Sequence, residues 1–249
     1  MQKQLKDFIK SFKADKIFLN IILYDLIFYL IATVSFVLGG YALRTQVGKV
    51  DTSMLNQYIL QRSPEEIQVL NSQMKAFFAV FILTILGVLI ALLAAWSLSR
   101  GLMFTSILKK KFNKNYFLKF AGLNLIIGAA AVAVILLFSR FIEIPSVFYI
   151  FYAVVLILVY FIAMIYTYFT KKNNQIFNSI GKGLTIGIKK LKHMFIPLLL
   201  ILAVFVILSF LNYGIQRYYQ IKYLSIILLI IYSAWARPYF VSEAEKVMS

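Results

Sequence analysis

The stretch that decides the fold is IFLNIILYDLIFYLIATVSFVLGGYAL, residues Ile17–Leu43, in which one aspartate interrupts an otherwise uncharged run. A helix needs about 20 apolar residues to cross the roughly 30 Å hydrocarbon core of a bilayer. The stretch is too long for the apolar core of a signal peptide, and it lacks a cleavage site of the Ala-x-Ala kind. We therefore expect a retained transmembrane helix.

Five further apolar stretches have a similar length. The chain is 62% hydrophobic with a mean hydropathy of +0.85, well above the roughly 45–50% apolar content of soluble domains. Backbone groups in lipid must bond within their own segment, so continuous runs predict helices rather than barrel strands. We predict an all-α integral membrane protein in which residues 1–249 form a single transmembrane domain. Its six spans are Ile17–Leu43, Ala76–Ser99, Leu118–Ser139, Ser146–Thr170, Phe195–Tyr213 and Lys222–Val241.

The positive charges indicate an orientation. Most of the 26 Lys and Arg residues fall in the N-terminal arm, in the loop after the second span, which we take to include Arg100, and in the loop after the fourth. Positively charged loops stay in the cytoplasm. We predict a multi-pass protein of the plasma (cytoplasmic) membrane with both termini cytoplasmic. The net charge of +17, placed beside apolar spans, favours a bilayer with anionic headgroups as partner, and not nucleic acid.

Each cytoplasmic segment ahead of an odd-numbered span has apolar residues at helical spacing beside a group of lysines. The apolar residues are Leu5, Phe8, Ile9 and Phe12, then Met103, Phe104, Ile107 and Leu108, then Ile180, Leu184, Ile188 and Leu191. This pattern predicts amphipathic elbows in the membrane interface. The candidate lipid-surface contacts are Lys109, Lys110, Lys111, Lys189, Lys190 and Lys192. The recurrence suggests three tandem helical hairpins, although convergent loop composition would give the same texture.

The longest outer segment, residues 44–75, carries a helix start signal. In Ser63-Pro64-Glu65-Glu66 a capping serine precedes a proline at the first helical position, and a glutamate follows three residues after the cap. This capping box predicts a helix that runs into the second span. Upstream, Met54, Leu55, Tyr58 and Ile59 recur at helical spacing and predict a short outer helix, with a solvated linker as the alternative.

Two ionisable residues lie inside the predicted spans: Asp25 in the first and Arg237 in the sixth. A charge at membrane depth costs about 2.5–3.5 kcal/mol on the insertion scale, so it tends to find a partner. Both lie in the cytoplasmic half, and we predict an ion pair between them. The pair is either a packing clamp or a transport device, unless Arg237 only extends to the interface. Asn20 and Asn124 lie at similar depth and complete a candidate intramembrane polar cluster, as cavity residues or as helix-to-helix hydrogen bonds.

Catalytic signals are nearly absent. The chain has no cysteine and one histidine, so neither a thiolate nor a His-based metal site is expected. No zinc-protease, phosphate-loop, nucleophile-elbow or dinucleotide motif occurs. We therefore expect no catalytic, cofactor-binding or metal-binding residues, no cofactor and no enzyme activity.

A resemblance in pattern covers most of the chain. The segment Ile188–Lys192 leading into Phe195, and the aromatic and arginine tail Trp235–Tyr239, resemble six-helix membrane families, including the membrane domain associated with glycerophosphodiester phosphodiesterases. The resemblance implies a membrane domain of unassigned biochemistry, and the soluble phosphodiesterase domain is absent from this chain.

Two function classes stay open. The first is an accessory, scaffold or permease-like subunit that works with a protein partner or as a homo-oligomer, and whose basic elbows face lipid. The second is a small autonomous transporter with Asp25 as its coupling carboxylate. The scarcity of intramembrane charge favours the first, since proton and ion relays usually need several titratable sites.

Overall fold

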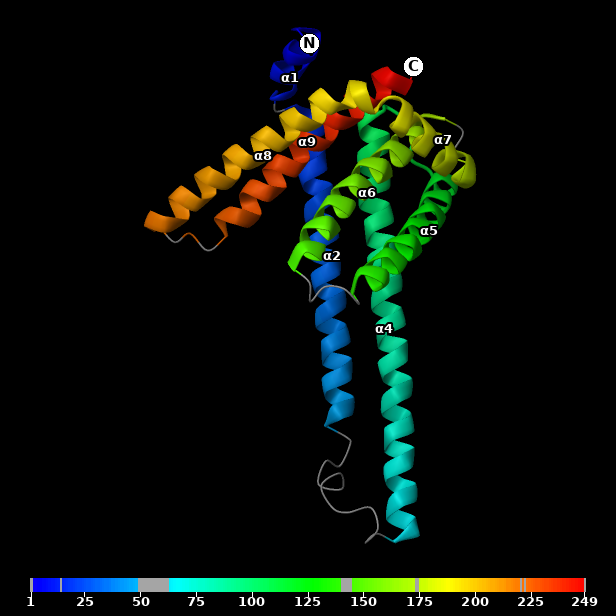
Figure 1. The fold of residues 1–249 in the computed structure, drawn as a ribbon. Coiled ribbons are helices and arrows are strands. Elements are labelled where there is room, and N and C mark those ends of the chain that lie inside the picture. The colour runs from blue at the N-terminus through cyan, green and yellow to red at the C-terminus, as the bar shows by residue number, and fades with distance from the viewer. Residues whose placement is uncertain are drawn as a thin grey trace. The chain divides into compact units, whose positions relative to one another are not determined.

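The computed structural model describes residues 2–13, 15–48, 63–139, 145–172, 175–219, 221 and 223–248, and these residues contain helices and short connections but no strand. Figure 1 shows the helices, and six of them are long and apolar enough to cross a membrane. The predicted all-α fold with six spans is confirmed. In chain order the helices are α1 (Gln2–Ser11), α2 (Lys16–Val47), α4 (Pro64–Ile107), α5 (Lys114–Ser139), α6 (Pro145–Lys171), α7 (Ile176–Lys189), α8 (Leu191–Tyr219) and α9 (Leu224–Met248).

Helix α4 is longer than predicted at its C-terminal end. It begins at Pro64, directly after Ser63, as the capping pattern predicts. It then continues past the predicted end of the span to Ile107, so that Met103 and Phe104 are buried in its last turns. The second predicted elbow is therefore wrong, because its apolar residues continue the spanning helix. The short outer helix predicted over Met54–Ile59 lies outside the described residues.

A tight turn ends α4 and starts α5. Lys109 adopts a left-handed conformation with φ of 52°, and the Lys110 amide donates back to the Thr105 carbonyl at 2.8 Å. This bond satisfies a carbonyl that the helix end would otherwise leave unpaired. Asn113 then caps α5, since its side-chain oxygen accepts from the Tyr116 amide at 2.8 Å.

The chain divides into two compact units by contact: residues 1–26 with 97–249, and residues 27–96. The second unit consists of the remainder of α2 and the first part of α4, which run antiparallel. The Phe28 and Trp96 rings meet at one end with centroids 5.4 Å apart. Further along, an added Cβ on Gly39 would come within 2.9 Å of the Val88 side chain. The single transmembrane domain expected from the sequence stays a prediction.

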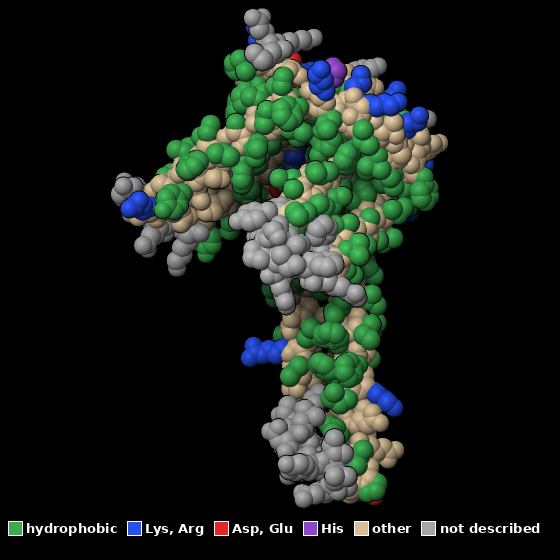
Figure 2. All heavy atoms as spheres, in the orientation of Figure 1, with side chains coloured by type: hydrophobic (Ala, Val, Ile, Leu, Met, Phe, Trp, Pro, Cys, Tyr) green, Lys and Arg blue, Asp and Glu red, His purple; other side chains and the backbone are tan. Residues whose placement is uncertain are grey.

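An aromatic cluster between α4, α5 and α6 forms the core of the first unit. Tyr116 and Phe120 stack with centroids 5.6 Å apart, and the Tyr166 ring lies 4.9 Å from that of Phe120. The Phe169 ring also packs on that of Phe120, and Phe104 of α4 packs edge-on against Tyr166. Elsewhere the spans expose large hydrophobic side chains, which Figure 2 shows over much of the visible face. Such a surface suits lipid tails as solvent.

The first predicted elbow is a separate helix, α1, that packs on α9 through aromatic rings. Phe12 stacks on Trp235 with centroids 4.7 Å apart, and the Trp235 indole N–H donates to the Ser11 hydroxyl at 2.9 Å. Near the C-terminus, the Lys246 ammonium lies 2.8 Å from the Asp7 carboxylate. The two chain ends therefore lie on the same side of this unit (Figure 1), as an even number of spans requires.

A proline in α8 adds a second attachment for α1. Pro197 has no N–H and cannot donate to the carbonyl of His193 four residues earlier. The Gln4 side-chain amide donates to that carbonyl instead, at 3.3 Å. The proline thus leaves an acceptor that the N-terminal helix uses.

The third predicted elbow is also a separate helix, α7, and it meets α6 through glycines. An added Cβ on Gly183 would lie 2.8 Å from the Ile165 Cα, and the Tyr160 hydroxyl donates to the Gly187 carbonyl at 2.9 Å. The apolar residues that predicted this elbow do not all face inward, since Ile188 is 66% exposed. Close backbone approach therefore sets this contact.

Replacing Gly183 by alanine should destabilise the protein, because the new methyl group meets the α6 backbone. Overpacking costs roughly 1–3 kcal/mol. Gly181→Ala is the matched control on the same helix, since its Cβ would meet nothing within 4 Å, and it should gain up to about 1 kcal/mol of helix propensity. Thermal unfolding in detergent compares the two. Equal effects of the two substitutions would contradict glycine-mediated packing.

Candidate functional site

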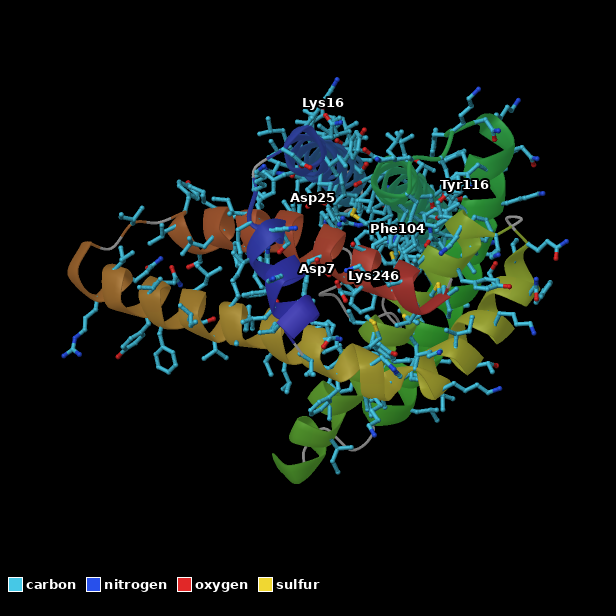
Figure 3. The ribbon with its side chains drawn as sticks, turned by 90° about the horizontal axis from the view of Figure 1, so that it is seen from above. Asp7, Lys16, Asp25, Phe104, Tyr116 and Lys246 are labelled. Carbon is cyan, nitrogen blue, oxygen red and sulfur yellow. The ribbon has the colours of Figure 1, made fainter. Side chains whose placement is uncertain are left out.

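The candidate site is built on Asp25, which lies in α2 and is only 2% exposed. From α9, the Arg237 Nη1 donates to both carboxylate oxygens, at 2.8 Å to Oδ1 and 2.6 Å to Oδ2. The ion pair predicted between the first and last spans is therefore formed. Figure 3, viewed from above, labels Asp25 among the ends of the helices of the first unit.

A second arginine, Arg100 of α4, binds the same carboxylate. Its Nη1 lies 2.6 Å from Asp25 Oδ1, and the residue is 5% exposed. Arg100 was predicted to lie in a cytoplasmic loop, and this prediction was wrong because α4 continues past Ser99 to Ile107. The missed signal was the helical spacing of Met103, Phe104 and Ile107, which continues the span beyond the arginine.

The three charged side chains join α2, α4 and α9 at one point. Both guanidinium groups also contact the sulfur of Met103, at 4.0 Å from Arg100 and 3.9 Å from Arg237. Hydrogen bonds between charged partners are short and about twice as strong as neutral ones. Removing one member of such a buried pair costs about 3–5 kcal/mol, because the other charge is left uncompensated. We call Asp25, Arg100 and Arg237 the ion clamp.

Asn124 belongs to a different network. Its amide nitrogen donates to the Ser97 hydroxyl at 2.9 Å, and its oxygen accepts a short bond from the Tyr166 hydroxyl. This network links α4, α5 and α6 within the aromatic core. Asn20 is half-buried in α2 and takes part in neither network among the described residues. The four predicted polar residues thus separate into an ion pair, a neutral network and a single asparagine, and a shared functional role for them stays a prediction.

A second ionic group, which the sequence analysis did not identify, lies beside the C-terminus. Lys246 contacts the carboxylates of Asp7 and Glu243, and Glu243 is 5% exposed. The spacing of Glu243 and Lys246, one turn apart in a helix, was a signal that could have shown their contact. The contact with α1 depends on tertiary packing, and no pattern in the sequence indicates it.

The six candidate lipid-contact lysines are exposed: Lys109, Lys110, Lys111, Lys189, Lys190 and Lys192. Figure 2 shows basic side chains gathered over α7 and the start of α8, at the end of the first unit that carries the chain ends. Their contact with lipid headgroups stays a prediction. Chemically, the ion clamp offers one carboxylate whose oxygens accept hydrogen bonds from two guanidinium groups. Within the part of the chain that the structure describes, no group of three or more His, Cys, Asp or Glu side chains could hold a metal ion.

Comparison with known proteins finds no family model, no curated protein and no solved structure that matches this chain. The resemblance to six-helix membrane families therefore stays a prediction.

The loss of unfolding free energy on replacing an arginine of the ion clamp should increase with the burial of that arginine. Arg100→Gln should cost about 3–5 kcal/mol of unfolding free energy, and Arg237→Gln should cost less because its side chain is 28% exposed. Asp25→Asn should cost at least as much as Arg100→Gln, since it leaves two guanidinium groups unpaired. Unfolding of each variant in detergent measures its loss of free energy and so tests this ranking.

The matched control is Glu245→Gln. The Glu245 side chain is 47% exposed, and its carboxylate lies 3.7 Å from the Lys171 ammonium. Such a surface pair contributes at most about 1 kcal/mol. A loss for Asp25→Asn no larger than the loss for the control would show that the ion clamp does not stabilise the fold.

Proposed function

We propose that the protein is a membrane-embedded scaffold or permease-like accessory subunit without enzyme activity. The observation that carries this proposal is the ion clamp. Its three charged residues lie well inside α2, α4 and α9, and both arginines bind the Asp25 carboxylate. This use of charge supports a structural role, in which a rigid bundle end presents its surfaces to other components of the membrane.

The geometry gives less support to Asp25 as a transport carboxylate. A coupling carboxylate must exchange its proton or ion with an aqueous path. Asp25 is 2% exposed and accepts hydrogen bonds from two arginines. Protonation would leave both guanidinium groups without their counter-charge. The transporter alternative is therefore retained only as an outcome of the test below.

The exposed lysines support a role at a membrane surface for the end of the first unit that carries α7, the start of α8 and the chain ends. We call this end the basic end. Each Lys or Arg near an anionic leaflet contributes about 1 kcal/mol of attraction. We place this end, with both chain termini, on the cytoplasmic side, where lysine-rich segments are retained. A protein partner or a second copy of the chain would then meet the scaffold along its apolar spans or on this basic end.

The proposed orientation predicts the labelling of single cysteines in a chain that naturally has none. Lys13, Asn178 and Ser63 are all exposed positions. Cysteines at 13 and 178 should react with an impermeant thiol reagent only after the membrane is opened, whereas a cysteine at 63 should react in intact cells. Labelling of position 13 or 178 from outside would reverse the orientation.

The scaffold role is tested by purification of the tagged chain from its native membrane in mild detergent. We expect a stoichiometric partner, or a stable homo-oligomer, that persists when Asp25→Leu, Arg100→Met and Arg237→Met together replace the ion clamp by apolar groups. Replacement of a whole buried ionic cluster is often neutral for stability. A monomer that shows pH-dependent flux in vesicles, with the flux abolished by the triple substitution, would instead establish the transporter.

A further inference from the structure

In the ion clamp, the Asp25 carboxylate is shared between the guanidinium groups of Arg100 and Arg237. The buried carboxylate of α9, Glu243, is bound to Lys246. A charge inside a span is costly, at about 2.5–3.5 kcal/mol on the insertion scale. Arg237 shares its counter-ion with a second arginine, so an anion at its remaining donors would lower this cost.

Arg237 has the free donors for such an anion. Its contacts with Asp25 and Met103 all use Nη1. An arginine carries five N–H donors, and the Nε and Nη2 groups bond to no other described residue. The side chain is 28% exposed, against 6% for Arg100. Arg237 thus holds Asp25 with one nitrogen and presents the others at the surface.

The surroundings of Arg237 are apolar and open. Helices α6 and α9 contact each other where the Tyr160 and Phe240 rings lie 6.1 Å apart. Nearer the N-terminal end of each helix, Leu156 of α6 and Ile226 of α9 are 66% and 55% exposed, so both helices offer apolar surface. Figure 2 shows a hollow between α6 and the hairpin of α8 and α9, with hydrophobic side chains around it and basic and acidic side chains at its bottom.

We propose that this hollow binds one anionic lipid, whose phosphate pairs with the free donors of Arg237 and whose acyl chains lie between α6 and α9. Charge complementarity selects an anion, and a guanidinium binds phosphate oxygens in a bidentate manner. The apolar walls and the depth of Arg237 in its span select an anion that carries hydrocarbon, rather than a free ion. The inference needs the ion clamp but is independent of the scaffold role.

The test uses the full chain in a non-ionic detergent, with phosphatidic acid and phosphatidylcholine of identical acyl chains. Native mass spectrometry counts bound lipid. The measurement is made at about 1 M salt, where the Debye length is about 3 Å and exposed lysines are screened. We expect one bound phosphatidic acid per chain, both in the wild type and in a variant that combines Lys189→Gln, Lys190→Gln and Lys192→Gln. The affinity for phosphatidylcholine should be lower by about tenfold or more.

Two variants locate the lipid. Arg237→Lys keeps a positive charge for Asp25 but removes the planar donors, and should weaken phosphatidic acid binding by about tenfold. Ile230→Trp leaves the ion clamp intact and fills the hollow two turns from Arg237 on the same helix face, and should also abolish binding. Its matched control, Ile231→Trp, points about a third of a turn away and should bind as the wild type does.

Several results would overturn the inference. Unchanged binding in Ile230→Trp would exclude the hollow even if Arg237→Lys failed to fold. Loss of binding in the triple lysine variant would assign the lipid to the basic surface. Displacement of the lipid by inorganic phosphate would show a site for free anions, and a co-purified peptide in place of lipid would show a protein ligand.

Discussion

One carboxylate held between two guanidinium groups fixes the point at which three helices of the first unit meet. Asp25, Arg100 and Arg237 come from helices far apart in the chain, and their contacts bring α2, α4 and α9 to one point. In water such a contact would compete with hydration, but in hydrocarbon the alternative for each side chain is an unsolvated charge. Lipid tails are as apolar as leucine, so burial alone gives little reason for spans to associate. The ion clamp supplies a specific reason.

The remaining contacts of the first unit follow the same constraint. Two of the uncharged contacts use small residues or neutral hydrogen bonds: Gly183 against α6, and Asn124 between Ser97 and Tyr166. Both are means by which helices associate in lipid. The aromatic core around Phe120 lies among these contacts. The buried contacts of the first unit are thus concentrated at the end that carries α7, and the other parts of its spans stay exposed.

The sequence was sufficient for the spans because span length and apolar content are properties of single segments. It was also sufficient for Asp25 and Arg237, since two opposite charges at similar depth have few other partners. Arg100 was missed because a positive residue after an apolar run is normally a boundary signal, and only the helical spacing beyond it indicates otherwise. The contact of Lys246 with Asp7 could not be predicted, because α1 is placed by aromatic packing on Trp235.

Polar and aromatic residues mark the parts of the spans that meet other helices. The segment Leu224–Met248 is the least hydropathic of the six spans found in the described residues, yet Trp235, Tyr239 and Glu243 are buried in it. The part of α4 that lies in the second unit is strongly apolar, and Ile82 and Leu83 there are exposed. A span that contacts only lipid can be uniformly apolar. A span that organises its neighbours must carry groups that lipid would reject, here Arg237, Trp235 and Tyr239, and it is stable only when other helices satisfy them. The polar residues of a span therefore mark where it joins its neighbours, and they are where function should be sought.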